Sequence, residues 1–517
     1  MNMTAGGALD NNIQLVFELI NSSESTLFDK KKACGFVEKL LALQGQINHE
    51  SVSIFIRLLD ELLLADKEQY LARDVLQRIS WLEPKDLVML DKVFFVWIGC
   101  LSERQLEYFD VWEEVCQDDT FIYYDSRCLL ASEIKDVLCR IHNCSHEDVA
   151  FIKHQSDWFE AFVESKERHL DEWLIDHTRV YDADIATELE HRLYRVRHRY
   201  YQLMKLVTLI DIASIDSLFV FSGFDLEPYY LYEVLLRNNL AAASHIVRLL
   251  VLYHQGGMYV DFDTLPSFEH CFPKTNRRFP EWVSNNMVDV LKAELVMNVF
   301  RTQQLTRFAR CQGDHQLVEN IVVTFFDDDK EQIKSLHEDV AAITEDKLFH
   351  PFILPPVHKE GLALTKVKNS VGEFNNNVLI APKGSKLIRI VLTMMSSRYR
   401  YMEDNGIIFD DIFTSRDCDV NNRLMESEEY WLRFSDYRYD HLRSSDKVTL
   451  FLSGPSLVLE VLISLAYEVF DIEGCSPNAV VFAMSHPGLK MAFEYQTQFT
   501  VEHMRSTWLR NQNLLSD

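Results

Sequence analysis

The spacing of apolar residues divides the chain into regions with different patterns. Between residues 11 and 84, apolar residues recur every three or four positions, for example in "VSIFIRLLDELLLA", which is the spacing of amphipathic helices. Polar stretches such as "NSSES" separate four segments of this kind. The pattern predicts four short helices that pack as an N-terminal helical bundle over residues 1–88.

A second pattern begins near residue 91. The runs "DKVFFVWIGC" and "TFIYYDSRCL" are rich in β-branched and aromatic residues and flank a helical segment; this strand–helix–strand order opens an α/β sheet. Helical spacing returns over about 131–215, and strand-like runs resume after it. We therefore expect an α/β fold, with a core over 89–517 and a helical insertion at about 131–215. The later strand candidates are "DSLFVFSGF", "GGMYVDFDTL", "NNNVLIAP", "TLFLSGP" and "NAVVFAMS".

Composition narrows the functional classes. The 517 residues carry a formal net charge of -27, and the sequence pI is about 5.1, which argues against nucleic-acid binding because that function needs a basic face. The ten cysteines include no CxxC pair, and the N-terminus lacks the basic and apolar regions of a secretory signal. The most apolar stretch, 448–470, is interrupted by Gly454, Pro455 and Glu460, so we expect no transmembrane segment.

One basic segment stands out from the acidic background, "EHRLYRVRHRYYQLMK" at 190–205. Arg192, Arg195 and Arg199 share one face of a helix there, and apolar residues share another. The pattern favours a solvated amphipathic helix over a contact with an acceptor protein, and either of these over nucleic-acid binding.

Two carboxylates follow an apolar run in "GGMYVDFDT". On a strand, alternation sends Asp261 and Asp263 to one side and Phe262 to the other. The two carboxylates repel each other unless they share a proton or a cation lies between them. A divalent ion, Mn²⁺ or Mg²⁺, suits such oxygen ligands and attracts phosphate. The pair therefore indicates a metal site that holds a nucleoside diphosphate.

The stretch "NLAAASHIVRLLVLYHQGGMYVDFDTLP" resembles the core motif of GT-A glycosyltransferases of the large clostridial cytotoxin type. Four further blocks, "KVFFVWIG", "FNNNVLI", "LFLSGP" and "RSTWLRNQ", are similar to family motifs and occur in the same order. The N-terminal helices are similar in pattern to the four-helix membrane-targeting bundle of that family. The resemblance implies a GT-A core and a possible contact of the bundle with a membrane surface.

The resemblance assigns roles around a UDP-sugar donor. Trp97 would stack on uracil, Arg248 would reach the nucleotide or the donor sugar, and Tyr259 would contact the ribose or the phosphates. Asn376 would contact the donor near the reacting carbon. The other positions assigned to the donor site are Val96, Ser244, His245, Asp261, Ser506 and Trp508.

The resemblance also implies a metal shell and a closing flap. Asp263 would bind the metal directly, and Asp261 would hold ribose or sugar hydroxyls and complete part of the shell. Ser506 and Trp508, on a C-terminal flap, would bind the diphosphate and its bridging oxygen and exclude water. A glutamate that the family has near this flap falls on His503, with Glu502 beside it; either residue could complete the metal shell, and Glu502 is favoured.

Two departures from the family pattern leave the donor sugar open. His245 stands where the family has an aspartate that grips the sugar hydroxyls, and a histidine supplies no bidentate carboxylate. Asn375 and Asn377 flank Asn376 where glucose-using members tend to be bulkier. Glucose and N-acetylglucosamine are therefore both candidates.

The function implied is a metal-dependent, retaining transfer of a hexose from a UDP-sugar to a serine or threonine hydroxyl of a host protein. The acceptor would be a small GTPase or a translation factor, and the enzyme a secreted bacterial effector or toxin that acts in the host cytoplasm. Two alternatives are a catalytically weak GT-A-like protein that binds nucleotide sugars, and an aspartate-based phosphatase, because "DFDT" resembles an aspartyl-phosphate motif.

Overall fold

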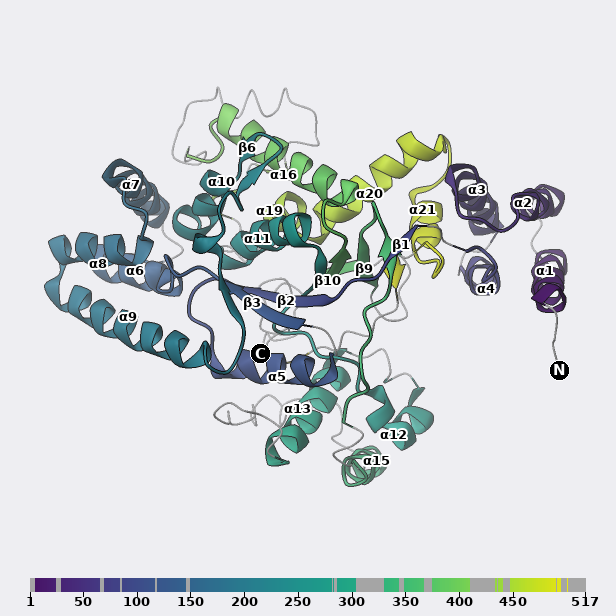
Figure 1. Cartoon of the computed structure of the whole chain (residues 1–517), viewed down its shortest axis with the longest axis horizontal. Helices are drawn as coiled ribbons and strands as arrows, with labels where there is room; N and C mark the ends of the chain where they lie inside the picture. The colour runs from purple at the N-terminus through teal and green to yellow at the C-terminus, as the bar shows by residue number, and fades with distance from the viewer. Residues whose placement is uncertain are drawn as a thin grey trace.

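A central sheet with helices on both faces forms the body of the molecule, and a group of N-terminal helices lies at one end of it (Figure 1). The computed structural model describes residues 5–24, 29–65, 69–83, 86–116, 119–145, 149–280, 282, 286–303, 330–343, 348–366, 374–409, 433–434, 436–439, 447–489, 491–493 and 500. The α/β class expected from the sequence is confirmed.

The main sheet has seven strands in the order β11-β9-β10-β7-β2-β3-β4. Its strands are β2 (Lys92–Trp97), β3 (Asp119–Tyr124), β4 (Leu209–Asp211), β7 (Gly257–Val260), β9 (Ala363–Lys366), β10 (Phe374–Ala381) and β11 (Ala492–Phe493). Strands β4, β3, β2 and β7 are parallel, whereas β10 is antiparallel to β7 and pairs Val378 with Val260. The carboxyl ends of β2 and β7 therefore meet the amino end of β10 at one edge of the sheet, where ligands bind in open α/β folds.

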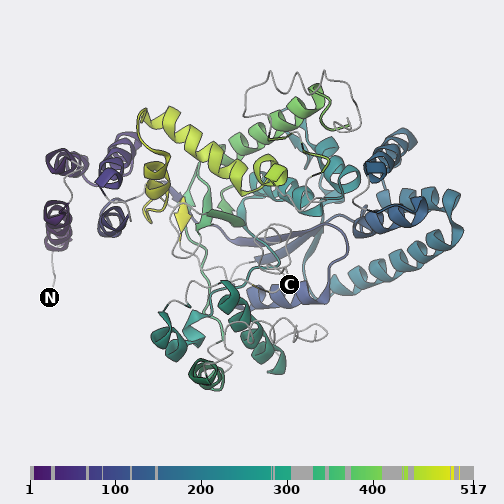
Figure 2. The same cartoon turned by 180° about the vertical axis from the view of Figure 1, so that it is seen from behind.

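The helices expected near the N-terminus are present. They are α1 (Ala5–Ser22), α2 (Lys30–Ala42), α3 (His49–Ala65) and α4 (Tyr70–Arg78). Helix α3 packs against α20 (Pro455–Phe470) and α21 (Pro477–Met484), so these two helices lie beside the N-terminal ones although they are far apart in the sequence (Figure 2). The apolar face of α3, which includes Phe55, Leu58 and Leu59, is fully buried.

The expected helical insertion projects from the opposite end of the sheet (Figure 1). It comprises the short turn η1 (Ala131–Glu133) and the helices α6 (Ile134–His142), α7 (Val149–Ser165), α8 (Leu170–Tyr181) and α9 (Ala183–Leu203). Along α9, Leu193, Val196 and Tyr200 are buried while Arg195 is exposed, which confirms the amphipathic helix. The Tyr200 hydroxyl donates to the Gly99 carbonyl at 2.9 Å, which ties α9 to the loop after β2.

The remaining helices cover the two faces of the sheet. Helix α11 (Leu240–Gln255) lies on the same side as α16 (Lys386–Asp404) and α20, whereas α5 (Glu103–Val115) and α13 (Asn286–Thr302) lie on the other side (Figures 1 and 2). The shorter elements are β1 (Leu87–Val88), η2 (Ile212–Ser214), β5 (Val220–Phe221), β6 (Phe224–Asp225), α10 (Glu227–Leu231), the π-helical turn η3 (Tyr232–Leu236), η4 (Glu269–Cys271), α12 (Pro273–Arg278), α15 (Lys330–Val340), β8 (Val357–His358) and α19 (Lys447–Leu452).

Two of the strand predictions were wrong: "TLFLSGP" ends α19 and begins α20, and "NAVVFAMS" lies in α21. "DSLFVFSGF" does contain a strand, β5, but this strand belongs to the small β5–β6 hairpin outside the main sheet. Short apolar runs do not distinguish a buried strand from a buried helix, because both lack alternation. Pro455 and Pro477 lie in the first turns of α20 and α21, a position that suits proline at a helix start. None of the helices in the described ranges is long and apolar enough to cross a membrane.

Candidate functional site

The acidic pair lies just beyond the end of β7. The strand ends at Val260, so Asp261 and Asp263 lie in the following turn and not on the strand that the sequence predicted. Phe262 is nevertheless buried, with its ring 4.8 Å from that of Phe95, while both aspartates are partly exposed. The turn therefore keeps the two carboxylates accessible and anchors them through the phenylalanine between them.

The glycine pair before β7 is needed for the chain to pass from α11 into the sheet. Gly256 has a φ of +71°, and a Cβ there would lie 2.5 Å from the backbone nitrogen of Lys383. Gly257 has a φ of +117°, and a Cβ there would lie 2.8 Å from the carbonyl oxygen of Lys92. Any side chain at these positions would push β7 away from β2 and β10, because only glycine fits this conformation and this spacing.

Asp261 is oriented by two buried side chains. Arg248, on α11 and 1% exposed, places Nη1 3.1 Å from Asp261 Oδ1. The Tyr259 hydroxyl donates to the same oxygen, and its ring centroid lies 4.8 Å from the Arg248 guanidinium carbon. Burial, with the charge of Asp261, raises the pKa of Tyr259, so the hydroxyl keeps its proton and acts as a donor.

The guanidinium of Arg248 has further donors. Nε and Nη2 are buried and make no hydrogen bond within the described part of the chain. A buried donor without an acceptor is unfavourable, so these nitrogens suit an anion that binds beside Asp261. A planar guanidinium is well matched to phosphate oxygens.

Strand β10 holds the acidic turn through Asn377. The Asn377 carbonyl accepts from the backbone N–H of Asp261 at 2.8 Å. The Asn377 side chain is buried; its Nδ2 donates to Thr264 Oγ1 at 3.2 Å, and its Oδ1 accepts from Thr365 Oγ1 at 2.7 Å. The pairing of β10 with β9 is irregular at this point, between Asn375 and Leu379, and such irregularities re-aim backbone groups near active sites.

Two more hydrogen bonds reach the turn from other elements. Trp112, on α5, donates through Nε1 to the Thr264 carbonyl at 2.7 Å. Thr500 donates through Oγ1 to the Asp263 carbonyl at 2.7 Å, so this residue lies at the same corner. Trp112, Thr264, Thr365 and Thr500 were not predicted as site residues, and of these only Thr264 lies within a recognised motif, "GGMYVDFDT".

The two carboxylates fit a divalent ion as part of a larger ligand set. Asp261 Oδ1 already binds Arg248 and Tyr259, whereas Asp263 Oδ1 makes a long contact of 3.4 Å with Thr264 Oγ1. Among the described residues, no group of three or more histidine, cysteine, aspartate or glutamate side chains could hold a metal. A Mg²⁺ or Mn²⁺ ion at Asp263 would therefore need oxygen ligands from a diphosphate, from water or from other residues.

The aromatic and sugar-side positions lie around the same edge. Trp97 ends β2 and packs edge-on against Phe262, with centroids 5.5 Å apart. Its Nε1 is buried and finds no hydrogen-bond partner in the described ranges. Val96, which precedes Trp97 on β2, is buried, and Asn376 on β10 is partly exposed.

His245 is part of the interior and not an open ligand. It is buried on α11, and its Nδ1 lies 3.0 Å from the hydroxyl of Ser453, at the end of α19. Burial, with the charge of Arg248, lowers the pKa of His245 well below its usual value, so the imidazole is neutral. Ser244, beside it, is partly exposed.

The C-terminal residues of the expected site, Glu502, His503, Ser506 and Trp508, lie outside the described residues. The expected site residues that the structure does describe lie at one edge of the sheet, where α11, β2, β7 and β10 bring them. A buried arginine, two partly exposed carboxylates and a tryptophan at the end of a strand form a corner that can hold an anion, a cation and a flat ring together.

Comparison with known proteins adds three findings. The family model of the TcdA/TcdB catalytic glycosyltransferase domain matches residues 144–435. Cytotoxin-L of Paraclostridium sordellii is 23% identical over 483 residues, which cover 86% of this chain but 19% of the relative, so the chain spans about a fifth of that protein's length. The catalytic domain of alpha-toxin from Clostridium novyi superposes with a TM-score of 0.63 at 16% identity and covers 97% of both chains.

A second solved structure, the UDP-bound glycosyltransferase domain from the YGT toxin, superposes with a TM-score of 0.51 at 17% identity and 82% coverage of both chains. Because the sequence identities to both structures are this low, the two superpositions show a shared fold and do not show a shared function.

Proposed function

The chain belongs to the TcdA/TcdB catalytic glycosyltransferase domain family, and from that premise we propose that the corner after β7 transfers a hexose from a UDP-sugar to a serine or threonine hydroxyl of a host protein. The observation that carries the proposal is the buried Arg248, bonded to Asp261 beside Tyr259 at the edge where β2 ends in Trp97. Those residues match the family's donor-site motif in sequence, and the fold gathers them.

The described side chains supply charge and orientation for the donor. Arg248 offers buried donors to the diphosphate, and Trp97 offers a ring face for uracil. Asp261, fixed by Arg248 and Tyr259, is positioned to accept from ribose or sugar hydroxyls. A divalent ion bound at Asp263, manganese or magnesium, would supply positive charge against the departing diphosphate.

The reaction is a retaining transfer. The bond between the anomeric carbon and the β-phosphate oxygen breaks, and the acceptor hydroxyl oxygen bonds to that carbon on the same face. The hydroxyl proton leaves with the UDP oxygen that departs. Within the corner, Arg248 stabilises the negative charge that develops on the diphosphate, the kind of contribution that a preorganised donor makes.

The donor sugar is glucose or N-acetylglucosamine. His245, which stands where the family pattern has a carboxylate, is a buried and neutral side chain that is bonded to Ser453. The side chain of Asn377 is turned inward to Thr264 and Thr365, which leaves Asn375 and Asn376 as the partly exposed amides on this stretch of β10. Neither observation decides between the two sugars, so both donors are tested.

The setting we propose is a secreted bacterial effector or toxin that acts in the host cytoplasm on a small GTPase or a translation factor. Its support is the family and the clostridial cytotoxin among its relatives. The same proposal includes contact of α1–α4 with a membrane surface. It also assigns Glu502 or His503 to the metal shell, and Ser506 and Trp508 to the closing flap.

The test is donor hydrolysis by the purified chain. The protein is incubated with Mn²⁺ and either UDP-glucose or UDP-N-acetylglucosamine, and release of UDP is followed by mass spectrometry. We expect one donor to be cleaved, with a loss of about a hundredfold or more in Asp263→Asn and none in Asp184→Asn, an exposed aspartate on α9. Absence of cleavage despite UDP binding would favour the non-catalytic alternative, and hydrolysis of simple phosphomonoesters would favour the phosphatase.

A further inference from the structure

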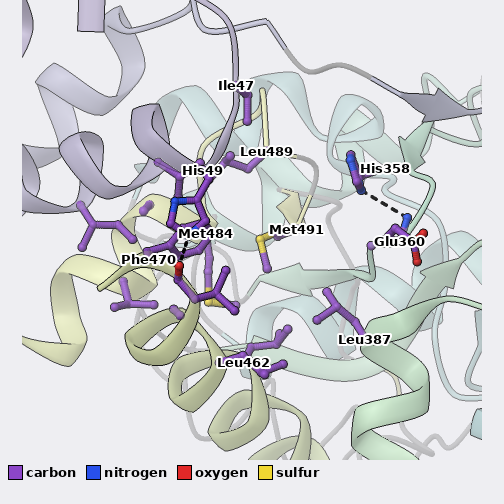
Figure 3. A pocket seen from close by; sticks show the side chains of 18 of the residues that line it. Ile47, His49, His358, Glu360, Leu387, Leu462, Phe470, Met484, Leu489 and Met491 are labelled. Atoms are coloured by element: carbon purple, nitrogen blue, oxygen red, sulfur yellow. Dashed lines mark hydrogen bonds between the residues drawn. The ribbon is translucent and has the colours of Figure 1, made fainter. Parts of the chain in front are cut away.

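A partly open cavity of 440 Å³ lies where the N-terminal helices meet the rest of the molecule (Figure 3). One wall is α3, with Val52 and Ile56. The opposite walls are α20, α21 and the start of α16, which contribute Leu462, Met484 and Leu387. Its volume falls within the range of small-molecule sites, about 300–1,000 Å³.

Most of the lining is apolar, with methionine sulfurs among aliphatic side chains (Figure 3). Protein interiors rarely leave gaps larger than a water molecule, and water is retained in a cavity only where several polar groups bind it. An apolar cavity of this size is therefore more stable with an apolar occupant than with water. Methionine side chains such as Met484 and Met491 adapt their shape to such an occupant.

Hydrogen bonds tie α3 to the elements on the opposite side of the cavity. His49, at the start of α3, bonds through Nε2 to the Val469 carbonyl on α20. Farther along α3, Asp60 Oδ1 accepts from both the backbone N–H and the hydroxyl of Ser476, at 2.8 Å each. These polar contacts fix the position of α3 relative to α20 and to the start of α21.

Polar groups gather at the other end of the cavity, around the β8–β9 turn. His358 Nδ1 accepts from the Glu360 backbone N–H at 3.2 Å, so the neutral ring carries its proton on Nε2 and can donate there. Lys386 Nζ lies 3.3 Å from Glu360 Oε1 and is exposed. Figure 3 places His358 and Glu360 at the opposite end of the lining from His49 and Phe470.

We propose that this cavity binds a single unbranched acyl chain, with a polar or anionic head near His358 and Lys386. An aliphatic lining with its donors at one end matches an amphiphile whose hydrocarbon part runs from that end toward His49. The site does not depend on the glycosyltransferase activity, since none of its lining residues belongs to the corner after β7.

In the first test, the full chain is titrated with straight-chain fatty acids from octanoate to palmitate, and calorimetry measures the binding affinity of each acid. Each added methylene should tighten binding about fourfold, because each buries a constant amount of apolar surface, and the gain should stop when the chain fills the cavity. The midpoint of thermal unfolding should rise with ligand concentration. Affinity that does not depend on chain length would overturn the proposal.

The second test fills the cavity with a side chain. Ala466, on α20, lines the cavity, whereas Ser464 lies on the exposed face of the same helix. Ala466→Phe should weaken binding of the longest chains at least tenfold, and Ser464→Phe should leave it unchanged. Equal affinities in the two variants would overturn the proposal. If circular dichroism shows that Ala466→Phe does not fold, Ala466→Leu is the milder form of the same test.

The third test separates the head from the chain and one source of ligand from another. Lys386→Gln should weaken a fatty acid about two- to fivefold, as expected for an exposed ion pair, and leave the matching alcohol unaffected. If a lysophosphatidylcholine of equal chain length competes with the fatty acid, we infer that the acyl chain belongs to a lipid. If it does not compete, we infer that the ligand is a free fatty acid. Binding to phosphatidylcholine vesicles without binding of either monomeric ligand would overturn the cavity as the site.

Discussion

The corner after β7 and the cavity beneath α3 are built from opposite kinds of contact. In the corner, Asp261, Asn377 and Thr264 are joined by directed hydrogen bonds, and Arg248 forms an ion pair that is mostly buried. In the cavity, aliphatic side chains face one another and polar groups lie only at the ends. Hydrogen bonds in a buried network fix one geometry, whereas apolar contact is non-directional.

The difference indicates how each region responds to mutation. Catalysis depends on placement to a fraction of an ångström, so changes in the corner should lower activity more than their effect on folding would suggest. The cavity should tolerate changes that keep it apolar and of similar size, and its variants should alter ligand affinity or stability without altering donor hydrolysis. Three predictions test that contrast.

The largest effect is expected at Arg248. Arg248→Met removes the partner of Asp261 and the unpaired buried donors, so kcat/KM for donor hydrolysis should fall about a hundredfold to a thousandfold, the range for loss of one preorganised donor. Arg248→Lys keeps a charge but not the planar fork, and should recover little. Steady-state hydrolysis is the measurement, with the exposed Arg195→Met as the control. Activity within a fewfold of wild type in Arg248→Met would remove the corner from the mechanism.

An intermediate effect is expected at Asn377. Asn377→Ala leaves the hydroxyls of Thr264 and Thr365 without their buried partner, which should lower the free energy of unfolding by about 1–3 kcal/mol. Because the acidic turn then loosens, kcat/KM should fall about tenfold to a hundredfold, while binding of an acyl chain stays unchanged. Urea unfolding and hydrolysis are measured together, with Asn11→Ala, an exposed asparagine on α1, as the control. Equal losses in both variants would argue against a positioning role.

The sequence was enough to predict the strands that carry the site. β2, β3 and β7 were recognisable because their apolar residues run consecutively, and Gly256 and Gly257 marked the turn before β7. The sequence could not distinguish α19 and α21 from strands, because residues that are buried on every side give the same run of apolar letters in either structure.

The contacts that position the site were not readable from the sequence. The hydrogen bonds from Asn377 to Thr264 and from Trp112 to Thr264 join residues that are 113 and 152 positions apart, and no local pattern reports such distances. The cavity depends in the same way on how α3 packs against α20 and α21. Asn377 was noticed only for its place beside Asn376, whereas the structure shows it as a support for the acidic turn.

The smallest effect concerns His245, whose pKa is well below its usual value because the ring is buried beside Arg248. Above about pH 6.5, both the folded and the unfolded chain hold a neutral His245. As the pH falls below that value, His245 is protonated in the unfolded chain but stays neutral in the folded chain. The free energy of unfolding therefore decreases. Between about pH 7.5 and 5.5 this residue should lower the free energy of unfolding by about 1 kcal/mol, and the free energy of unfolding of His245→Gln should fall by that much less than that of wild type. Urea midpoints of both proteins at the two pH values measure the difference, and other titrating groups cancel in the comparison. An equal loss in both proteins would mean that His245 is charged in the fold, and the corner would then carry two buried cations where we infer one.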